Sequence, residues 1–248
     1  MLSAAGARVY PELLQAFDKI SHSVQTLERW ETRRTLHISA APSFAAQWLA
    51  PRLGAFSALH PQVDVQLDSS AALVDLRREG VDIAIRHGLG RYPGLHAEHL
   101  MAPVLLPVAS PALLAGTPTV SSVQDCLQLP LLQDADRSDW RLWFQALDLP
   151  IDERLERGPA FDDDLLLIRA AVAGQGIAPV RDIHAAEELA NGRLQVVIDR
   201  PWPQAFAYYA VTRADCESNA AIPAFMTWLH AALMTPQEAG THASRDAG

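Results

Sequence analysis

The chain has 248 residues, of which 49% are hydrophobic and 20% charged, a composition ordinary for a globular protein of one or two domains. The net charge of −9 argues against nucleic-acid binding by this chain itself, because phosphate neutralisation needs clustered basic side chains. We find no apolar run near the roughly 20 residues that span a bilayer. The first residues also lack a signal peptide's basic flank and apolar core. We therefore expect a cytoplasmic protein, with Cys126 and Cys216 as reduced thiols.

Residues 1–33 form the first unit of the chain. Apolar side chains recur there at steps of three and four, the spacing of a coiled-coil seam. The seam residues are Leu13, Phe17, Ile20, Val24 and Leu27. We interpret residues 1–33 as a linker helix that pairs subunits into a homodimer or homotetramer. The alternative is a helix that packs on its own domain.

From Leu36 onward, short apolar runs alternate with amphipathic segments, which predicts an α/β fold with a largely parallel sheet. The expected strands are 36–40, 63–67, 81–86, 103–109, 130–133, 177–180, 194–198 and 206–212. The expected helices are 44–59, 71–79, 111–115, 121–127, 138–147, 163–173, 182–190 and 218–234.

Two extended stretches, Met101–Ala109 and Phe206–Thr212, are candidates for crossings between two lobes. If both cross, the middle of the chain is an insertion into the first lobe, and a cleft lies at the hinge. We therefore expect lobe I at 34–104 plus 208–234 and lobe II at 105–207. Residues 235–248 are small and polar, and we expect a disordered tail.

Several residues are candidates for ligand contact. Ser43 begins a helix directly after the first strand, where ligands bind in α/β sheets, although a serine there can also simply cap the helix. His87 follows a strand end, with a solvated loop histidine as the alternative. Asp162–Asp164 suits a helix cap better than a metal cluster, and one of the three aspartates could face the cleft.

Catalytic motifs are missing from the sequence. The glycines between Gly88 and Gly94 have the wrong spacing for a dinucleotide fingerprint, and Pro93 prevents a following helix. There is no nucleophile elbow, zinc-protease motif, paired-cysteine motif or P-loop. We expect no enzyme, no cofactor and no metal.

Motifs along most of the chain resemble the LysR-type transcriptional regulators. Residues 2–6 resemble the pattern that ends the winged helix-turn-helix of that family. Residues 38–44, 48–53 and 60–61 match the start of its first regulatory lobe, and 170–178 with 189–194 match its second. Residues 82–88 and 92–95 resemble the branch that includes activators of glycine cleavage and β-lactamase expression.

The resemblance implies an effector-binding domain with two Rossmann-like lobes joined by two crossover strands, like a type 2 periplasmic binding protein. It also implies an effector pocket between the lobes. The residues that match this pocket are Pro42, Ser43, Phe44, Ser69, Ser70, His87, Gln133, Asp134, Phe161 and Asp162. Asp162 departs from the uncharged polar residue expected there, and a carboxylate in the cleft would repel an anionic effector or select an amine.

The resemblance also bears on partners. The family's DNA-binding domain would lie upstream of Leu2, so this chain would meet promoter DNA only through that domain. A transporter's solute-binding protein of the same two-lobed architecture is the alternative function, although the seam in residues 1–33 argues against it. An enzyme is a third class, for which we find no nucleophile–base pair or ligand set.

Overall fold

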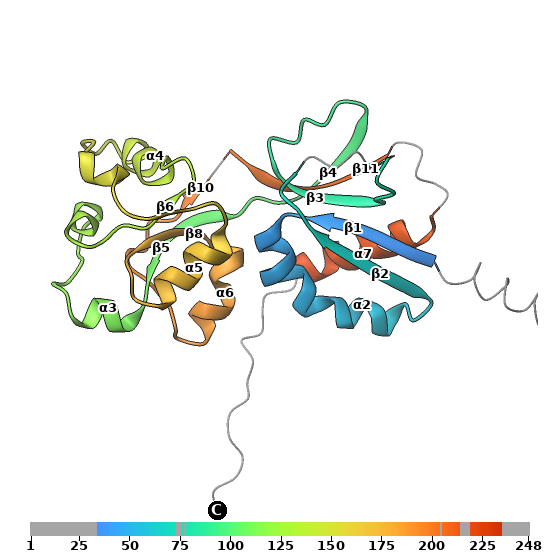
Figure 1. The fold of residues 1–248 in the computed structure, drawn as a ribbon, viewed down its shortest axis with the longest axis horizontal. Coiled ribbons are helices and arrows are strands. Elements are labelled where there is room, and N and C mark those ends of the chain that lie inside the picture. Colours follow the sequence, from blue (N-terminus) through green and yellow to red (C-terminus); the bar gives the residue numbers. More distant parts are fainter. Residues whose placement is uncertain (1–33, 73–75, 77, 204, 214–218, 235–248) are drawn as a thin grey trace, which may run out of the picture.

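The computed structural model describes residues 34–72, 76, 78–203, 205–213 and 219–234. Figure 1 shows two lobes side by side, with the chain passing between them. The predicted linker helix at 1–33 and the predicted tail at 235–248 lie outside the described residues. Within the described part, no helix is both long enough and apolar enough to cross a bilayer.

Lobe I is built on a five-stranded sheet in the order β2-β1-β3-β11-β4. The central strand β1 runs parallel to β2 and β3, whereas β11 runs antiparallel to β3 and β4. The strands are β1 (Arg34–Ala40), β2 (Val63–Ser69), β3 (Ile83–Gly88), β4 (Leu95–Met101) and β11 (Ala207–Arg213). The sequence did not predict β4, because it is a half-exposed edge strand in which polar side chains obscure the apolar pattern.

Helices lie against one face of this sheet (Figure 1). They are η1 (Phe44–Leu49), η2 (Ala50–Arg52), α2 (Leu53–Leu59) and α7 (Ala221–Met234). The helix predicted at 44–59 is confirmed, but its type changes along the segment, from a π-helical stretch through a 3-10 turn to an α-helix. Pro51, which has no amide donor for the helical ladder, lies in the 3-10 turn. The core of the lobe includes Leu36, Ile38, Phe44, Phe56 and Phe225.

The helix predicted for 71–79 falls in part on residues 73–75 and 77, which lie outside the described residues. The described residues of this stretch, 71, 72, 76, 78 and 79, are not helical. Leu76 is nevertheless buried, beside Val81, Ala84 and Val211 on the second face of the sheet. One buried leucine satisfies this contact, so its burial does not require the apolar stripe of a helix.

Lobe II is built around β5 (Val104–Ala109), which pairs antiparallel with β8 (Ala178–Arg181), β9 (Gln195–Val196) and β10 (Trp202–Pro203). A short parallel pair joins β6 (Gln133–Asp134) and β7 (Ala160–Phe161). The helices are α3 (Pro111–Ala115), η3 (Val123–Gln128), α4 (Asp139–Ala146), η4 (Glu153–Glu156), α5 (Asp164–Val172) and α6 (Asp182–Ala190).

The prediction of a largely parallel sheet is therefore wrong for the sheet around β5 in lobe II, where every pairing is antiparallel, and it holds for β1, β2 and β3 in lobe I and for the short β6–β7 pair. Apolar alternation reports which face of a strand is buried, but it does not report the direction in which the strand runs. The α/β class itself is confirmed, because both sheets carry helices packed against them.

The chain passes from the first sheet to the second between Met101 and Val104, and it returns between Pro203 and Ala207. Most of each predicted crossing stretch is thus a strand within one sheet: 104–109 is β5, and 207–213 is β11. The residue limits of the two lobes stay a prediction.

Candidate functional site

A cavity of about 610 Å³ lies between the lobes, and both lobes contribute to its walls. Lobe I contributes Ala41, Pro42, Ser43, Ala71, Arg86, His87 and Tyr208. Lobe II contributes a longer series that includes Asp134, Asp139, Phe161, Asp162, Asp164, Arg181, His184 and Phe206. The cavity thus lies where the carboxyl ends of the parallel strands of lobe I face the second lobe, which is the usual place for a ligand in such sheets.

The loop after β1 forms the lobe I wall at Ser43. The amide of Ala41 donates a hydrogen bond to the carbonyl of Ile85 at 3.0 Å, which ties the loop to β3. Ser43 already has a helical backbone, and its side chain does not cap the helix that follows. The capping alternative for this serine is therefore wrong. Only 6% of Ser43 is exposed, and it lines the cavity.

His87 projects from β3 on the same face as Tyr208, its antiparallel partner in β11. Its ring packs against Tyr208 and Phe206, with centroid distances of 4.9 and 5.6 Å. The Nε2 atom is buried, and it has no hydrogen-bond partner among the described residues. Burial, together with the nearby Arg181, lowers the pKa of His87 to about 4. The ring is therefore neutral at neutral pH.

A buried series of hydrogen-bonded side chains, Arg181, Asp164 and His184, connects lobe II to Tyr208. The Asp164 carboxylate accepts hydrogen bonds from Arg181 Nη1, at 2.8 and 2.9 Å, and lies 2.7 Å from His184 Nδ1. On the other side of the imidazole, His184 Nε2 lies 3.0 Å from the Tyr208 hydroxyl. Burial alone raises the pKa of Asp164, but the contacts with His184 and Arg181 outweigh it and hold the pKa below its ordinary value.

Further carboxylates crowd the lobe II wall. Asp163 accepts from the amide of Leu165 at 2.7 Å, so the predicted helix cap is confirmed for this residue. Asp134 accepts from the amides of Ser138 and Asp139, at the start of α4. Only 8% of Asp139 is exposed. Burial, and to a smaller extent repulsion from Asp134, raises the pKa of Asp139 to about 7. Asp162 is exposed and lines the cavity.

The structure brings six of the ten residues predicted for the pocket to the cavity. They are Pro42, Ser43, His87, Asp134, Phe161 and Asp162. Phe44 instead lies in the core of lobe I, stacked on Trp48 and Tyr208. Gln133 is fully buried, and its amide donates to the carbonyls of Leu155 and Arg157.

The two remaining predicted residues, Ser69 and Ser70, lie at the end of β2 beside the cavity-lining Ala71. The Ser70 amide donates to the carbonyl of Ala40, and its hydroxyl accepts from the amide of Ala72. Neither serine lines the cavity.

The sequence analysis did not predict several of the residues that line the cavity. Arg181 ends β8, and its place at a strand end could have identified it. Tyr208 lies within β11 and His184 within α6, so the local pattern shows them only as interior positions. Asp139 falls within the helix predicted for 138–147, where nothing in the local pattern marked it as a site residue.

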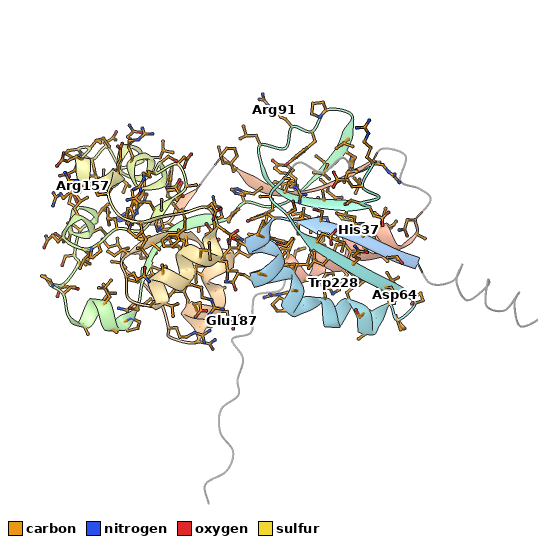
Figure 2. The ribbon with its side chains drawn as sticks, viewed as in Figure 1. His37, Asp64, Arg91, Arg157, Glu187 and Trp228 are labelled. Atoms are coloured by element: carbon orange, nitrogen blue, oxygen red, sulfur yellow. The ribbon has the colours of Figure 1, made fainter. Side chains whose placement is uncertain are left out.

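The fold and the cavity together define a two-lobed ligand-binding domain. Among the described residues, no group of histidine, cysteine and carboxylate side chains is arranged to hold a metal ion. In Figure 2, Arg157 lies on the side of lobe II that faces away from lobe I, and Asp64 and Trp228 lie within lobe I.

Residues 30–234 match the model of the LysR substrate binding domain, so the chain belongs to the LysR family of transcriptional regulators. It is 32% identical to the glycine cleavage system transcriptional activator of Escherichia coli K12, over 96% of this chain and 78% of that protein. It is 33% identical to the activator AmpR of Pseudomonas aeruginosa, over 92% of this chain and 76% of that protein.

Solved structures show the same relationship. The effector domain of AmpR from P. aeruginosa is similar to this chain with a TM-score of 0.70 at 31% identity, covering 81% of this chain and 95% of that one. The AmpR effector binding domain of Citrobacter freundii gives a TM-score of 0.72 at 26% identity, covering 81% and 98%. The chain is thus a regulator's effector-binding domain, and neither an enzyme nor a transporter's solute-binding protein.

Proposed function

We propose that the effector of this regulator binds in the cavity between the lobes, in contact with both. The observation that carries the proposal is that polar groups from both lobes, Ser43 and His87 on one side and Asp139 and Asp162 on the other, line one cavity. A small molecule that touches both walls stabilises the arrangement of lobes to which it binds more tightly. The shift it causes is limited by its differential affinity for the two arrangements.

Contacts outside the cavity would carry this change. Ile183 of α6 packs against the hydrophobic core of lobe I, and α6 also contacts η1. A change in the arrangement of the lobes therefore either carries α6 along with η1 or shifts the packing between them. The contact between Tyr208 and His184 crosses the same boundary. An effector beside Tyr208 can therefore favour or disfavour the connection between the lobes without any change inside either lobe.

The seam of residues 13–27 pairs two subunits, and the oligomer is a homodimer or homotetramer in the cytoplasm. Promoter DNA is bound by the family's DNA-binding domain, and the net charge of −9 supports the view that this chain contributes no DNA surface of its own. A gel-shift experiment with the 248-residue chain should therefore show no specific DNA binding, and tight operator binding would contradict this part.

A thermal-shift screen tests the cavity itself. Amino acids, peptides and aromatic acids are screened against the wild-type chain, and each hit is titrated by calorimetry against Ser43→Ala and Asp162→Ala. Matched controls are Ser57→Ala on the exposed side of α2 and Asp199→Ala on the surface of lobe II. We expect weaker binding in both cavity variants and wild-type binding in both controls. Unchanged affinity in both cavity variants would contradict the proposed site.

A further inference from the structure

We propose that Asp164 and His184 orient the hydroxyl of Tyr208 so that its oxygen can only accept a hydrogen bond from the effector. The effector then presents a donor, such as a hydroxyl or an amide N–H group, at this point of the cavity. This inference rests on the proposed function, because it assumes that the effector occupies the cavity. It gives the site a hydrogen-bonding polarity and assigns Asp164 and His184 as positioning residues.

The first step concerns the carboxylate in the middle of the buried series. Asp164 accepts from Arg181 Nη1, and it lies 2.7 Å from His184 Nδ1. Burial alone raises the pKa of Asp164, but the contacts with His184 and Arg181 hold it below its ordinary value, so the carboxylate is ionised at neutral pH. An ionised carboxylate can only accept hydrogen bonds. The proton between the two groups therefore belongs to Nδ1 of His184.

The second step concerns the other nitrogen of the same ring. Only 1% of the His184 side chain is exposed, and Arg181 already supplies a positive charge beside Asp164. An imidazolium would place a second buried cation against one carboxylate, at a cost in desolvation. The neutral ring, with its single proton on Nδ1, avoids this cost. Its Nε2 atom carries no proton and can only accept a hydrogen bond.

The third step follows from the contact between the lobes. The Tyr208 hydroxyl lies 3.0 Å from His184 Nε2. Burial raises the pKa of Tyr208 above its ordinary value, so the hydroxyl keeps its one proton at neutral pH. That proton points to Nε2, because the nitrogen has none to give. No other residue of the described part hydrogen-bonds to the Tyr208 hydroxyl, so its oxygen keeps a free lone pair and has no proton left to donate.

The fourth step connects this polarity to the ligand. Tyr208, His184, Asp164 and Arg181 all line the cavity, and the Tyr208 hydroxyl lies at the boundary between the lobes. An ether or carboxylate oxygen placed against it would leave two buried acceptors unpaired, which costs binding free energy. A donor instead completes the series of hydrogen bonds, whose members strengthen one another. The site therefore favours a donor over an acceptor.

Nitrogen NMR of the chain labelled with ¹⁵N-histidine tests the assignment without any ligand. Protonated and unprotonated ring nitrogens give well-separated signals, and the signals lost in His184→Gln identify this ring among the nine histidines. At pH 8 we expect a protonated Nδ1 and an unprotonated Nε2 in His184. A proton on Nε2, in the other neutral form or in the imidazolium, would overturn the inference.

Two variants test the hydrogen bonds on either side of the ring. In Tyr208→Phe, the Nε2 signal of His184 should move toward that of a nitrogen without a hydrogen bond, whereas the control Tyr209→Phe should leave it in place. In Asp164→Asn, the amide oxygen can stay with Arg181, and the NH₂ group then faces Nδ1. We expect the His184 proton to move to Nε2 in this variant.

Far-UV circular dichroism checks that these variants are folded. An unchanged ring in folded Asp164→Asn would overturn the positioning role of that residue, as would an Nε2 signal that does not respond to Tyr208→Phe. If Asp164→Asn does not fold, the wild-type spectrum and Tyr208→Phe still decide the outcome.

Two isomeric probes test the consequence for binding. 2-Phenylethanol and benzyl methyl ether contain the same atoms, one ring and one accepting oxygen, but only the alcohol can donate. Their ring suits the apolar part of the lining, which includes Phe161, Trp202 and Phe206. In NMR titrations the wild-type chain should prefer the alcohol about tenfold. The preference should disappear in Tyr208→Phe and persist in Tyr209→Phe.

The outcomes separate this inference from the proposed function. An ether that binds in the cavity as tightly as the alcohol would overturn the donor and leave the cavity as the effector site. An alcohol that does not bind, or a preference that persists in Tyr208→Phe, would also overturn the inference. The proposed function has its own measurement, hydrogen exchange with the hits from the effector screen. If those hits protect no cavity residue, the proposed function fails, whichever nitrogen of His184 carries the proton.

Discussion

Lobe I meets the cavity mainly with uncharged side chains near the ends of its strands, and its one lining arginine, Arg86, is hydrogen-bonded within the lobe I sheet, whereas lobe II meets the cavity with carboxylates and Arg181 at the starts of helices and a strand end. In lobe I, Ser43 and His87 are held by a sheet in which β1 pairs on both sides. In lobe II, Asp139 and Asp164 begin helices α4 and α5, where the helix dipole favours a negative side chain. One lobe therefore supplies shape and the other supplies charge.

The two lobes also differ in the hydrophobic cores that lie behind their cavity walls. The cavity side of lobe I is backed by one large apolar cluster that includes Phe44 and Tyr208. Lobe II divides its interior into two clusters, one beneath α5 and α6 and the other around Trp140 and Trp143. The charged chain through Asp164 and His184 lies between this divided core and lobe I, so we expect the stability of lobe II to depend more strongly on its polar contacts.

The largest effect is expected for Asp164→Ala. The change leaves Arg181 and the buried His184 without their carboxylate, and breaking a buried ion pair in this way costs about 3–5 kcal/mol. Urea unfolding followed by tryptophan fluorescence measures the loss.

The matched control is Glu153→Ala, which removes the partner of Arg157 on the outer side of lobe II (Figure 2). Both side chains of that pair are mostly exposed, at 80% and 67%, so the control should not change the unfolding midpoint measurably. Equal midpoints for the two variants would show that the buried chain does not stabilise lobe II.

Asp139→Asn should stabilise the protein, and the gain should depend on pH. Because the folded protein holds the Asp139 proton up to about pH 7, whereas the ordinary value is 3.8, wild-type stability falls as pH rises between these values. The variant escapes this loss, and above pH 7 the difference is at most about 4 kcal/mol. Thermal unfolding from pH 4 to pH 8 measures it, and a gain that does not change with pH would contradict the raised pKa.

Tyr208→Phe is expected to have the smallest effect on stability. It removes one hydrogen bond to His184 and should cost about 1 kcal/mol. Its more specific consequence is faster hydrogen exchange in α6, because the polar contact between the lobes is lost. Tyr209→Phe is the control, since Tyr209 lies next in the strand and packs on the opposite face, near Tyr92. The same exchange rates in both variants would show that Tyr208 does not connect the lobes.

Helices with their own end signals could be predicted well from the sequence. Segments 111–115 and 182–190 match their predicted limits, and the first begins with Pro111 after Ser110, whose side chain accepts from the amide of Leu113. Strand direction could not be predicted, because no local pattern records it. The strands β4 and β10 were missed because one is a half-exposed edge strand and the other has two residues.

Some residues of the candidate site could likewise be predicted from the sequence, and others could not. Ser43, His87 and Asp162 could be predicted because they lie at strand ends or before a helix, where ligands bind in this kind of fold. Tyr208 and His184 could not, because each lies inside an element, and the contact between them joins residues 24 positions apart. Phe44 was predicted for the pocket only through the family resemblance, and its ring is fully buried and does not line the cavity.

Hydrogen–deuterium exchange with and without a hit from the effector screen would show whether the effector binds between the lobes, because one measurement reports on both walls of the cavity. We expect slower exchange in the loop that carries Ser43 and in residues 161–165, together with the start of α4 at Asp139. The outer helices α2 and α3 should be unaffected. Protection confined to one lobe, or placed on those outer helices, would contradict the claim that the effector binds between the lobes.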